Sequence, residues 1–177
     1  MKHSREFEIA FVGLKPGEHE FTYQITDRFF EKFEKPEFYD ANIDVRLVMD
    51  KKSSTFLLTF YINGKATIMC DRCGEDYSML LWDEFELLVK QIEDVDVNKR
   101  REEDPEVGYI GRSESIMDVS AWIYEFIILS IPMQHIHPED AEGNSTCNAE
   151  VLEFLKKQQN ETSQKLWQEL NKLNIKK

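Results

Sequence analysis

Hydrophobic and polar residues alternate over the first half of the chain, and this pattern predicts β-strands. Apolar residues at every second position face one side of a strand, so each segment is expected to be half-buried. The alternation predicts strands over residues 6–12, 19–26, 42–50, 55–69 and 77–90. In the last segment Leu80 and Trp82 are expected to face the same side as Phe85, after a register break near Asp83–Glu84. Turn residues separate several of the segments, which favours an antiparallel sheet or partial barrel.

The second half of the chain changes to a helical pattern. Ser115–Asp118 resembles a capping box and predicts a helix over about 116–130, which Pro132 ends. Because this helix is apolar on nearly all sides, we expect it to be buried against the sheet, with Glu125 in need of a partner. Much of the contact is expected from Trp122, Ile123, Phe126 and Ile127.

The C-terminal residues predict a separate helical segment. Asn148 can cap a helix that carries Val151, Leu152 and Leu155. Further apolar residues recur at helical spacing at Leu166, Trp167, Leu170 and Leu173. The fold class is therefore predicted to be α+β, with a single domain over 1–150 and a helical tail over 151–177.

The composition describes an acidic protein with no predicted membrane span. The 177 residues include 34 Asp and Glu against 22 Lys and Arg, for a net charge of -12. This balance argues against general coating of nucleic acid and favours a basic partner. There is no apolar signal segment near the N-terminus, and three cysteines do not suggest a disulfide framework. We therefore expect a cytoplasmic protein.

The pair Cys70 and Cys73 indicates a specific chemistry more clearly than any other motif in the chain. Two thiolates at this spacing can hold one metal ion, and Gly74 permits the tight turn that follows. The same spacing occurs in thiol redox enzymes, where the pair normally opens a helix. Here strand-like segments flank the pair, so we predict a zinc knuckle at the tip of a hairpin, and the zinc- or redox-enzyme alternative stays open.

A closed structural zinc site needs two more ligands. The remaining candidates are Cys147 and the four histidines, His3, His19, His135 and His137. His137 and Cys147 lie at the two ends of one loop and could reach the same ion, which completes a Cys3His site; His135 could replace His137. Four protein ligands leave no open position for water, so such a site would be structural, and no catalytic residues are predicted.

Residues 93–106 form an acidic connecting loop with a small basic island. The segment holds seven acidic and three basic residues and is predicted to be a solvated loop. Its basic residues, Lys99, Arg100 and Arg101, are the candidate contacts to a phosphate group.

These features together resemble the YceD family, the large ribosomal RNA subunit accumulation proteins. The resemblance rests on Cys70-Asp71-Arg72-Cys73, then Ile116-Met117-Asp118-Val119 before an apolar helix with Glu125, and Leu129-Ser130-Ile131-Pro132 at its end. It covers roughly residues 1–150. Many members carry further cysteines after the Leu-x-Ile/Leu-Pro segment, and here His137 and Cys147 stand near the first and last of these.

The resemblance implies a non-enzymatic role in ribosome assembly. Members of the family support the processing or accumulation of large-subunit (23S) ribosomal RNA. With the acidic charge, this implies that the partner is a basic ribosomal protein, an assembly factor or a pre-large-subunit particle rather than naked RNA.

Overall fold

The computed structural model describes residues 5–97, 100, 103–104 and 106–159. The chain divides into two compact units, and each is described by itself. Unit 1 comprises Met1–Thr67 and Ser78–Pro132, and unit 2 comprises Ile68–Tyr77 and Met133–Lys177. The predicted division of the chain at residue 150 stays a prediction.

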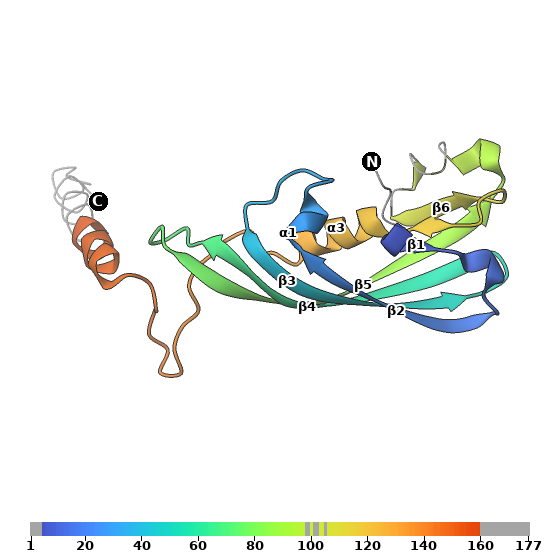
Figure 1. Ribbon diagram of the computed structural model, residues 1–177. Helices are drawn as coiled ribbons and strands as arrows, with labels where there is room; N and C mark the ends of the chain where they lie inside the picture. Colours follow the sequence, from blue (N-terminus) through green and yellow to red (C-terminus); the bar gives the residue numbers. More distant parts are fainter. Residues whose placement is uncertain (1–4, 98–99, 101–102, 105, 160–177) are drawn as a thin grey trace, which may run out of the picture. The chain divides into compact units, whose positions relative to one another are not determined.

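The main feature of the fold is a five-stranded sheet in the order β2-β3-β4-β5-β6 (Figure 1). Its strands are β2 (Gly17–Thr26), β3 (Tyr39–Lys51), β4 (Thr55–Met69), β5 (Asp76–Ile92) and β6 (Val107–Gly111). The first four lie where the alternating pattern predicted strands. The sheet is mixed, because β6 pairs parallel to β5, so the prediction of a purely antiparallel sheet was wrong. With β2 and β6 at its edges, a partial barrel is not confirmed.

The first predicted strand belongs to a different, two-stranded sheet. Within residues 6–12 only β1 (Glu8–Ile9) is extended, between short 3-10 turns at Arg5–Phe7 and Phe11–Gly13. β1 pairs antiparallel with β7 (Met117–Asp118), not with the main sheet. The apolar side chains of Phe7, Ile9 and Phe11 are nevertheless buried, which explains the alternation that predicted a strand.

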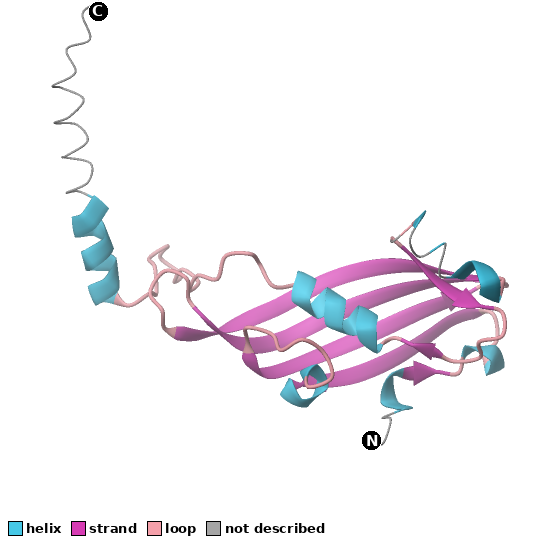
Figure 2. Ribbon diagram, turned by 90° about the horizontal axis from the view of Figure 1, so that it is seen from above, coloured by secondary structure: helices cyan, strands magenta, loops and turns pink. Residues whose placement is uncertain are grey.

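The helix α3 (Ser120–Leu129) lies across one face of the main sheet, as predicted, but it is shorter than expected (Figure 2). The proposed capping box was wrong, because Met117–Asp118 is extended and the helix has no side-chain N-cap. The Asp118 carboxylate instead accepts a hydrogen bond from the Ser120 backbone N–H at 2.8 Å. The short helix α1 (Asp27–Phe30) lies on the same side of the sheet (Figure 1).

α3 buries one side rather than its whole surface. Ile123, Phe126 and Ile127 are buried, Trp122 is half-buried, and Leu129 is 60% exposed. The Phe126 ring packs against the rings of Phe60 at 5.0 Å and Phe85 at 4.7 Å. Glu125 is exposed, so its expected need for a buried partner was wrong.

β5 keeps a regular alternation of buried and exposed residues. Met79, Leu81 and Val89 are buried, whereas Leu80 and Trp82 are 82% and 80% exposed. The predicted register break near Asp83–Glu84 was therefore wrong, and it had placed two exposed apolar side chains in the core. Leu80 and Trp82 lie on the face of the sheet opposite to α3.

Gly64 allows close approach of two strands in the sheet. It is paired with Ile43, and a Cβ atom there would overlap the backbone oxygen of Asn42. The Asn63-Gly64 sequence therefore lies inside β4 rather than at a turn between strands.

The acidic segment 93–106 contains local helical structure in its described residues. A 3-10 turn spans Asp94–Asp96, and residues 97, 100 and 103 are helical, so the expectation of an irregular loop was wrong in part. No helix among the described residues is long and apolar enough to cross a membrane.

Candidate metal centre

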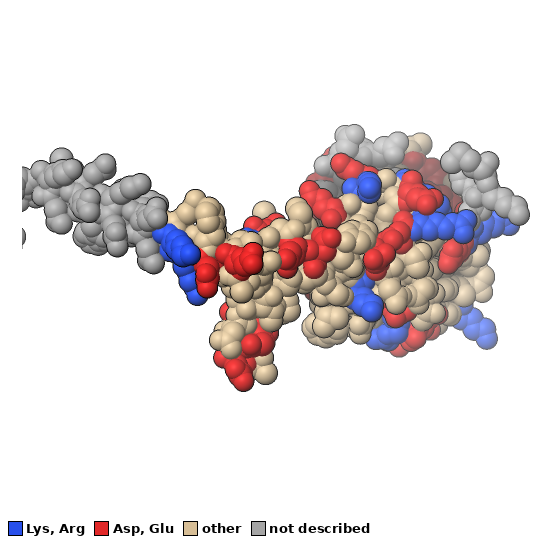
Figure 3. Space-filling model, turned by 60° about the vertical axis from the view of Figure 1, so that its left-hand side comes forward, with Lys and Arg blue, Asp and Glu red and all other residues tan. Residues whose placement is uncertain are grey.

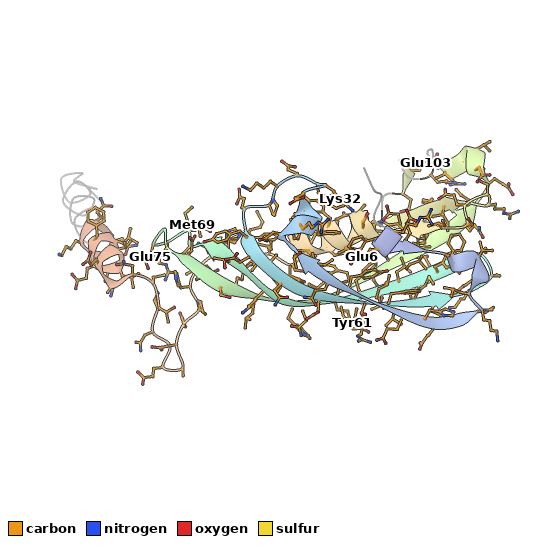
Figure 4. The ribbon with its side chains drawn as sticks, viewed as in Figure 1. Glu6, Lys32, Tyr61, Met69, Glu75 and Glu103 are labelled. Carbon is orange, nitrogen blue, oxygen red and sulfur yellow. The ribbon has the colours of Figure 1, made fainter. Side chains whose placement is uncertain are left out.

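The Cys70-x-x-Cys73 segment forms a tight turn between β4 and β5, as the sequence predicted. The Cys70 backbone N–H donates to the Glu75 carbonyl at 2.9 Å, and the Gly74 N–H donates to the Cys70 carbonyl at 2.8 Å. Gly74 has a φ of 74°, a conformation that glycine adopts without steric cost. Figure 4 labels Met69 and Glu75 on either side of this turn.

Asp71 joins the turn to the loop that follows α3. Its backbone N–H donates to the His135 carbonyl at 2.7 Å, and its carboxylate accepts from the His135 backbone N–H at 2.7 Å. The His135 ring lies next to the same carboxylate, at 3.9 Å between Nδ1 and Oδ1. Asp71 therefore fixes the register of the loop, and His137, two residues further on, lies beside the cysteines.

A small hairpin brings Cys147 back to the two cysteines of the turn and His137. Glu139 and Ser145 form an isolated antiparallel bridge. Between them the Asp140 carboxylate accepts hydrogen bonds from the Asn144 backbone N–H at 2.8 Å, the Asn144 side-chain amide at 3.2 Å and the Glu142 backbone N–H at 2.9 Å. These bonds, those of Asn144 above all, hold the pKa of Asp140 below its usual range. Gly143 closes the turn with a φ of 82°.

The four predicted ligands converge on one point. One ligand atom from each of Cys70, Cys73, His137 and Cys147 lies within 4.8 Å of all the others. The Sγ atoms of Cys70 and Cys147 are 3.8 Å apart, and His137 Nδ1 is 3.5 Å from Cys73 Sγ and 3.8 Å from Cys147 Sγ. Cys70 and Cys147 are buried and all three cysteines are free thiols. This group, the Cys3His cluster, could hold a metal ion.

The environment of the cluster favours the thiolate form of Cys70. Burial raises the pKa of the Cys70 thiol, but hydrogen bonds from the His137 side chain and from nearby backbone N–H groups outweigh this effect and bring the pKa to about 6. The backbone N–H of Asn148 lowers the pKa of Cys73, but burial and the adjacent Cys70 raise it, and the net shift is upward. The pair thus loses its first proton easily, and a bound cation would favour loss of the second.

Two further residues support the cluster. The Tyr77 ring packs on the His137 ring, with centroids 4.7 Å apart, and burial followed by the negative charge of Cys70 raises the pKa of Tyr77. Asn148 caps the helix described over 149–159, because its side-chain oxygen accepts the backbone N–H groups of Glu150 at 2.9 Å and Val151 at 3.3 Å. The predicted N-cap is confirmed, and this N-cap residue directly follows Cys147.

The other described candidate residues are not members of this cluster. His19 is on β2, where its Nε2 atom lies 2.7 Å from the Lys15 carbonyl oxygen. His3, Lys99 and Arg101 lie outside the described residues, and Arg100 pairs with Glu103 at 3.2 Å. The phosphate contact suggested for this basic island stays a prediction.

Sequence reasoning missed the roles of Asp71 and Tyr77. Asp71 occupies the first position between the cysteines, where a short carboxylate can accept local backbone N–H groups. Its distance in sequence from His135 left no signal for the contact between them.

The fold and the cluster define an α+β protein with a candidate Cys3His metal centre. Comparison with protein families gives a match over residues 58–174 to the model described as "Large ribosomal RNA subunit accumulation protein YceD". The match covers more than half of the chain, and the chain belongs to the YceD family. The resemblance was expected over roughly residues 1–150. The match instead begins later and extends further toward the C-terminus, so it includes most of the predicted tail. No curated protein and no solved structure matches the chain.

Proposed function

We propose that the Cys3His cluster binds a structural zinc ion. A tetrahedral zinc ion with Zn–S bonds of about 2.3 Å and Zn–N bonds of about 2.0–2.1 Å keeps its ligand atoms about 3.5–3.8 Å apart. Three separations agree with this requirement, namely Cys70 to Cys147 at 3.8 Å, Cys73 to His137 at 3.5 Å and Cys147 to His137 at 3.8 Å. All of the ligand atoms lie within 4.8 Å of one another. Zinc would join the turn after β4 to the segment that follows α3 and would stabilise unit 2, without an open position for a substrate.

We infer that the chain is a non-enzymatic ribosome-assembly factor of the cytoplasm. In this role it supports the processing or accumulation of large-subunit (23S) ribosomal RNA by binding a ribosomal protein or a pre-ribosomal particle. The family match over residues 58–174 is the observation that carries this proposal. The net charge of -12 supports a basic protein surface as the direct partner, because phosphates would be repelled. Figure 3 shows acidic side chains spread over the face that it presents.

Gradient sedimentation of a cell extract tests this proposal. At low salt the protein is expected in fractions that contain precursors of the large subunit, and at high salt it should shift toward the top of the gradient. The shift follows from screening, which limits the reach of exposed charges to about 8 Å at 0.15 M salt. A purified fragment of large-subunit RNA is expected to bind weakly at that salt concentration. Absence from all ribosomal fractions at low salt would contradict the assembly role.

One observation favours the enzyme alternative, namely the pKa of about 6 for Cys70. A redox pair normally lies at the start of a helix, whereas Cys70 and Cys73 lie in a turn between strands, and Cys70 is 1% exposed. Titration of thiols separates the two functions. A structural site predicts tightly held zinc and slow thiol modification, and reversible oxidation of Cys70 with Cys73 would instead support the enzyme.

A further inference from the structure

The main sheet has one face that no helix among the described residues of unit 1 covers. α1 and α3 both lie over the opposite face (Figures 1 and 2). Tyr61, whose neighbours Phe60 and Ile62 are buried, points away from α3 on the open face (Figure 4). A groove of about 630 Å3 crosses this face over β2, β3, β4 and β5. Its lining includes Asp44, Arg46, Tyr61, Asn63, Trp82 and Glu84.

The groove contains the residue types that dominate binding energy in protein interfaces. Trp, Tyr and Arg are enriched among such residues, and here Trp82 is 80% exposed. The Arg46 guanidinium lies 4.0 Å from the Tyr61 ring centroid and 3.5 Å from the Glu20 carboxylate, so it is already paired. Among the described residues no cation or aromatic ring stacks on Trp82. The indole is thus available to an external group.

The charge of the groove indicates which chemical group would bind beside Trp82. Asp44 lies between Gln24 and Asn63 in the sheet register, and neither Asp44 nor Glu84 has a cationic partner among the described residues. An indole face next to carboxylates binds an ammonium or guanidinium group through cation–π attraction and ion pairing. The same carboxylates repel phosphate. The groove therefore suits Lys or Arg side chains better than a nucleic-acid strand.

The dimensions of the groove suit an extended chain. Four strands spaced about 4.8 Å apart span about 14 Å, which is the length of about four to five extended residues at about 3.3 Å each. Alternate residues of an extended segment point the same way, so cations at every second position would face the groove.

We propose that this groove binds an extended Lys- and Arg-containing segment of a basic protein, with one cation placed over Trp82. The inference rests on the proposed function and names the surface through which the protein would contact its partner. The carboxylates of Asp44 and Glu84 hold the cations beside the indole.

Fluorescence anisotropy of the full chain with a labelled peptide tests the proposal. The probe is a short peptide in which Lys and Arg alternate with Thr. The wild-type chain is expected to bind at low salt, and Trp82→Ala should weaken binding at least about tenfold, as is usual for a residue that dominates an interface. Glu84→Gln should also weaken binding. Because Trp82 is largely exposed, its replacement should leave the thermal midpoint unchanged.

Glu125→Gln is the matched control, since it removes the same charge from an exposed position on α3. The control should bind the peptide as the wild type does. Equal weakening by Glu84→Gln and Glu125→Gln would show general charge attraction and overturn the proposal. Unchanged binding by Trp82→Ala, or no binding of the peptide by the wild type, would also overturn it. Tighter, Trp82-dependent binding of a single-stranded uridine oligonucleotide would assign the groove to RNA instead.

Sedimentation of the same variants separates this inference from the proposed function. If the wild type sediments with large-subunit precursors and Trp82→Ala does so equally, the groove is not the docking surface but the assembly role stands. If the peptide binds with the expected dependence while the wild type never sediments with ribosomal particles, the groove stands and the assembly role is wrong.

Discussion

At the scale of single residues, two histidines two positions apart have different roles. His137 lies in the Cys3His cluster, whereas His135 is held by Asp71. His137→Ala should therefore reduce bound zinc from about one ion per chain to a small fraction and lower the thermal midpoint, because structural zinc stabilises the fold. His135→Ala, the matched control, should keep its zinc. Atomic absorption of the purified variants makes the comparison, and retention of zinc by His137→Ala would exclude it as a ligand.

The thiol of Cys70 predicts a pH dependence in the metal-free protein. Its pKa falls from an ordinary 9.0 to about 6 in the folded state, so the folded state favours the thiolate. This contribution to stability is present above pH 9 and is lost as the pH falls through about 6. In the presence of a chelator, the free energy of unfolding should decrease over this range in urea titrations. Cys70→Ser should flatten the decrease, and an equally steep decrease in that variant would assign the effect to other groups.

The sequence could predict the four members of the cluster but not all of its geometry. Cysteine spacing and the Gly- and Asn-containing loop pointed to Cys70, Cys73 and Cys147 as a group. The choice between His135 and His137 depended on backbone contacts of Asp71, which join residues far apart in the chain. Such contacts have no local pattern in sequence.

At the scale of elements, α3 is expected to stabilise unit 1 mainly through its buried side. Phe126→Ala removes a ring that packs on Phe60 and Phe85, so it should lower the free energy of unfolding by about 3–5 kcal/mol. Leu129→Ala on the exposed side of the same helix should have little effect. Denaturant melts of both variants make the test. Similar small losses in the two variants would mean that the contact of α3 with the sheet is not central to stability.

The elements themselves were predictable where the pattern was long. β2, β3, β4 and β5 each alternate over ten or more residues, which fixes their inward faces. β6 has five residues, two of them glycine, and a parallel partner cannot be inferred from local alternation. Leu80 and Trp82 misled the prediction because their apolar character suggested burial, whereas the period of β5 required exposure. This conflict between residue type and period is itself the signal for the groove on the open face.

For the molecule as a whole, the family and the net charge support the same proposed role in ribosome assembly. The chain belongs to the YceD family and has a net charge of -12. In the proposed account, zinc stabilises unit 2, the open sheet face of unit 1 contacts a basic segment, and neither unit carries out catalysis. We propose that the protein thereby supports accumulation of large-subunit ribosomal RNA.

The proposed role is tested by the ratio of 23S to 16S ribosomal RNA in cells of the source organism depleted of the protein. Depletion is expected to lower this ratio; the wild-type gene should restore it, and His137→Ala should restore it poorly. Because that variant loses stability, its cellular level should be measured alongside. An unchanged ratio after complete depletion would show that the protein has no role in accumulation of large-subunit ribosomal RNA.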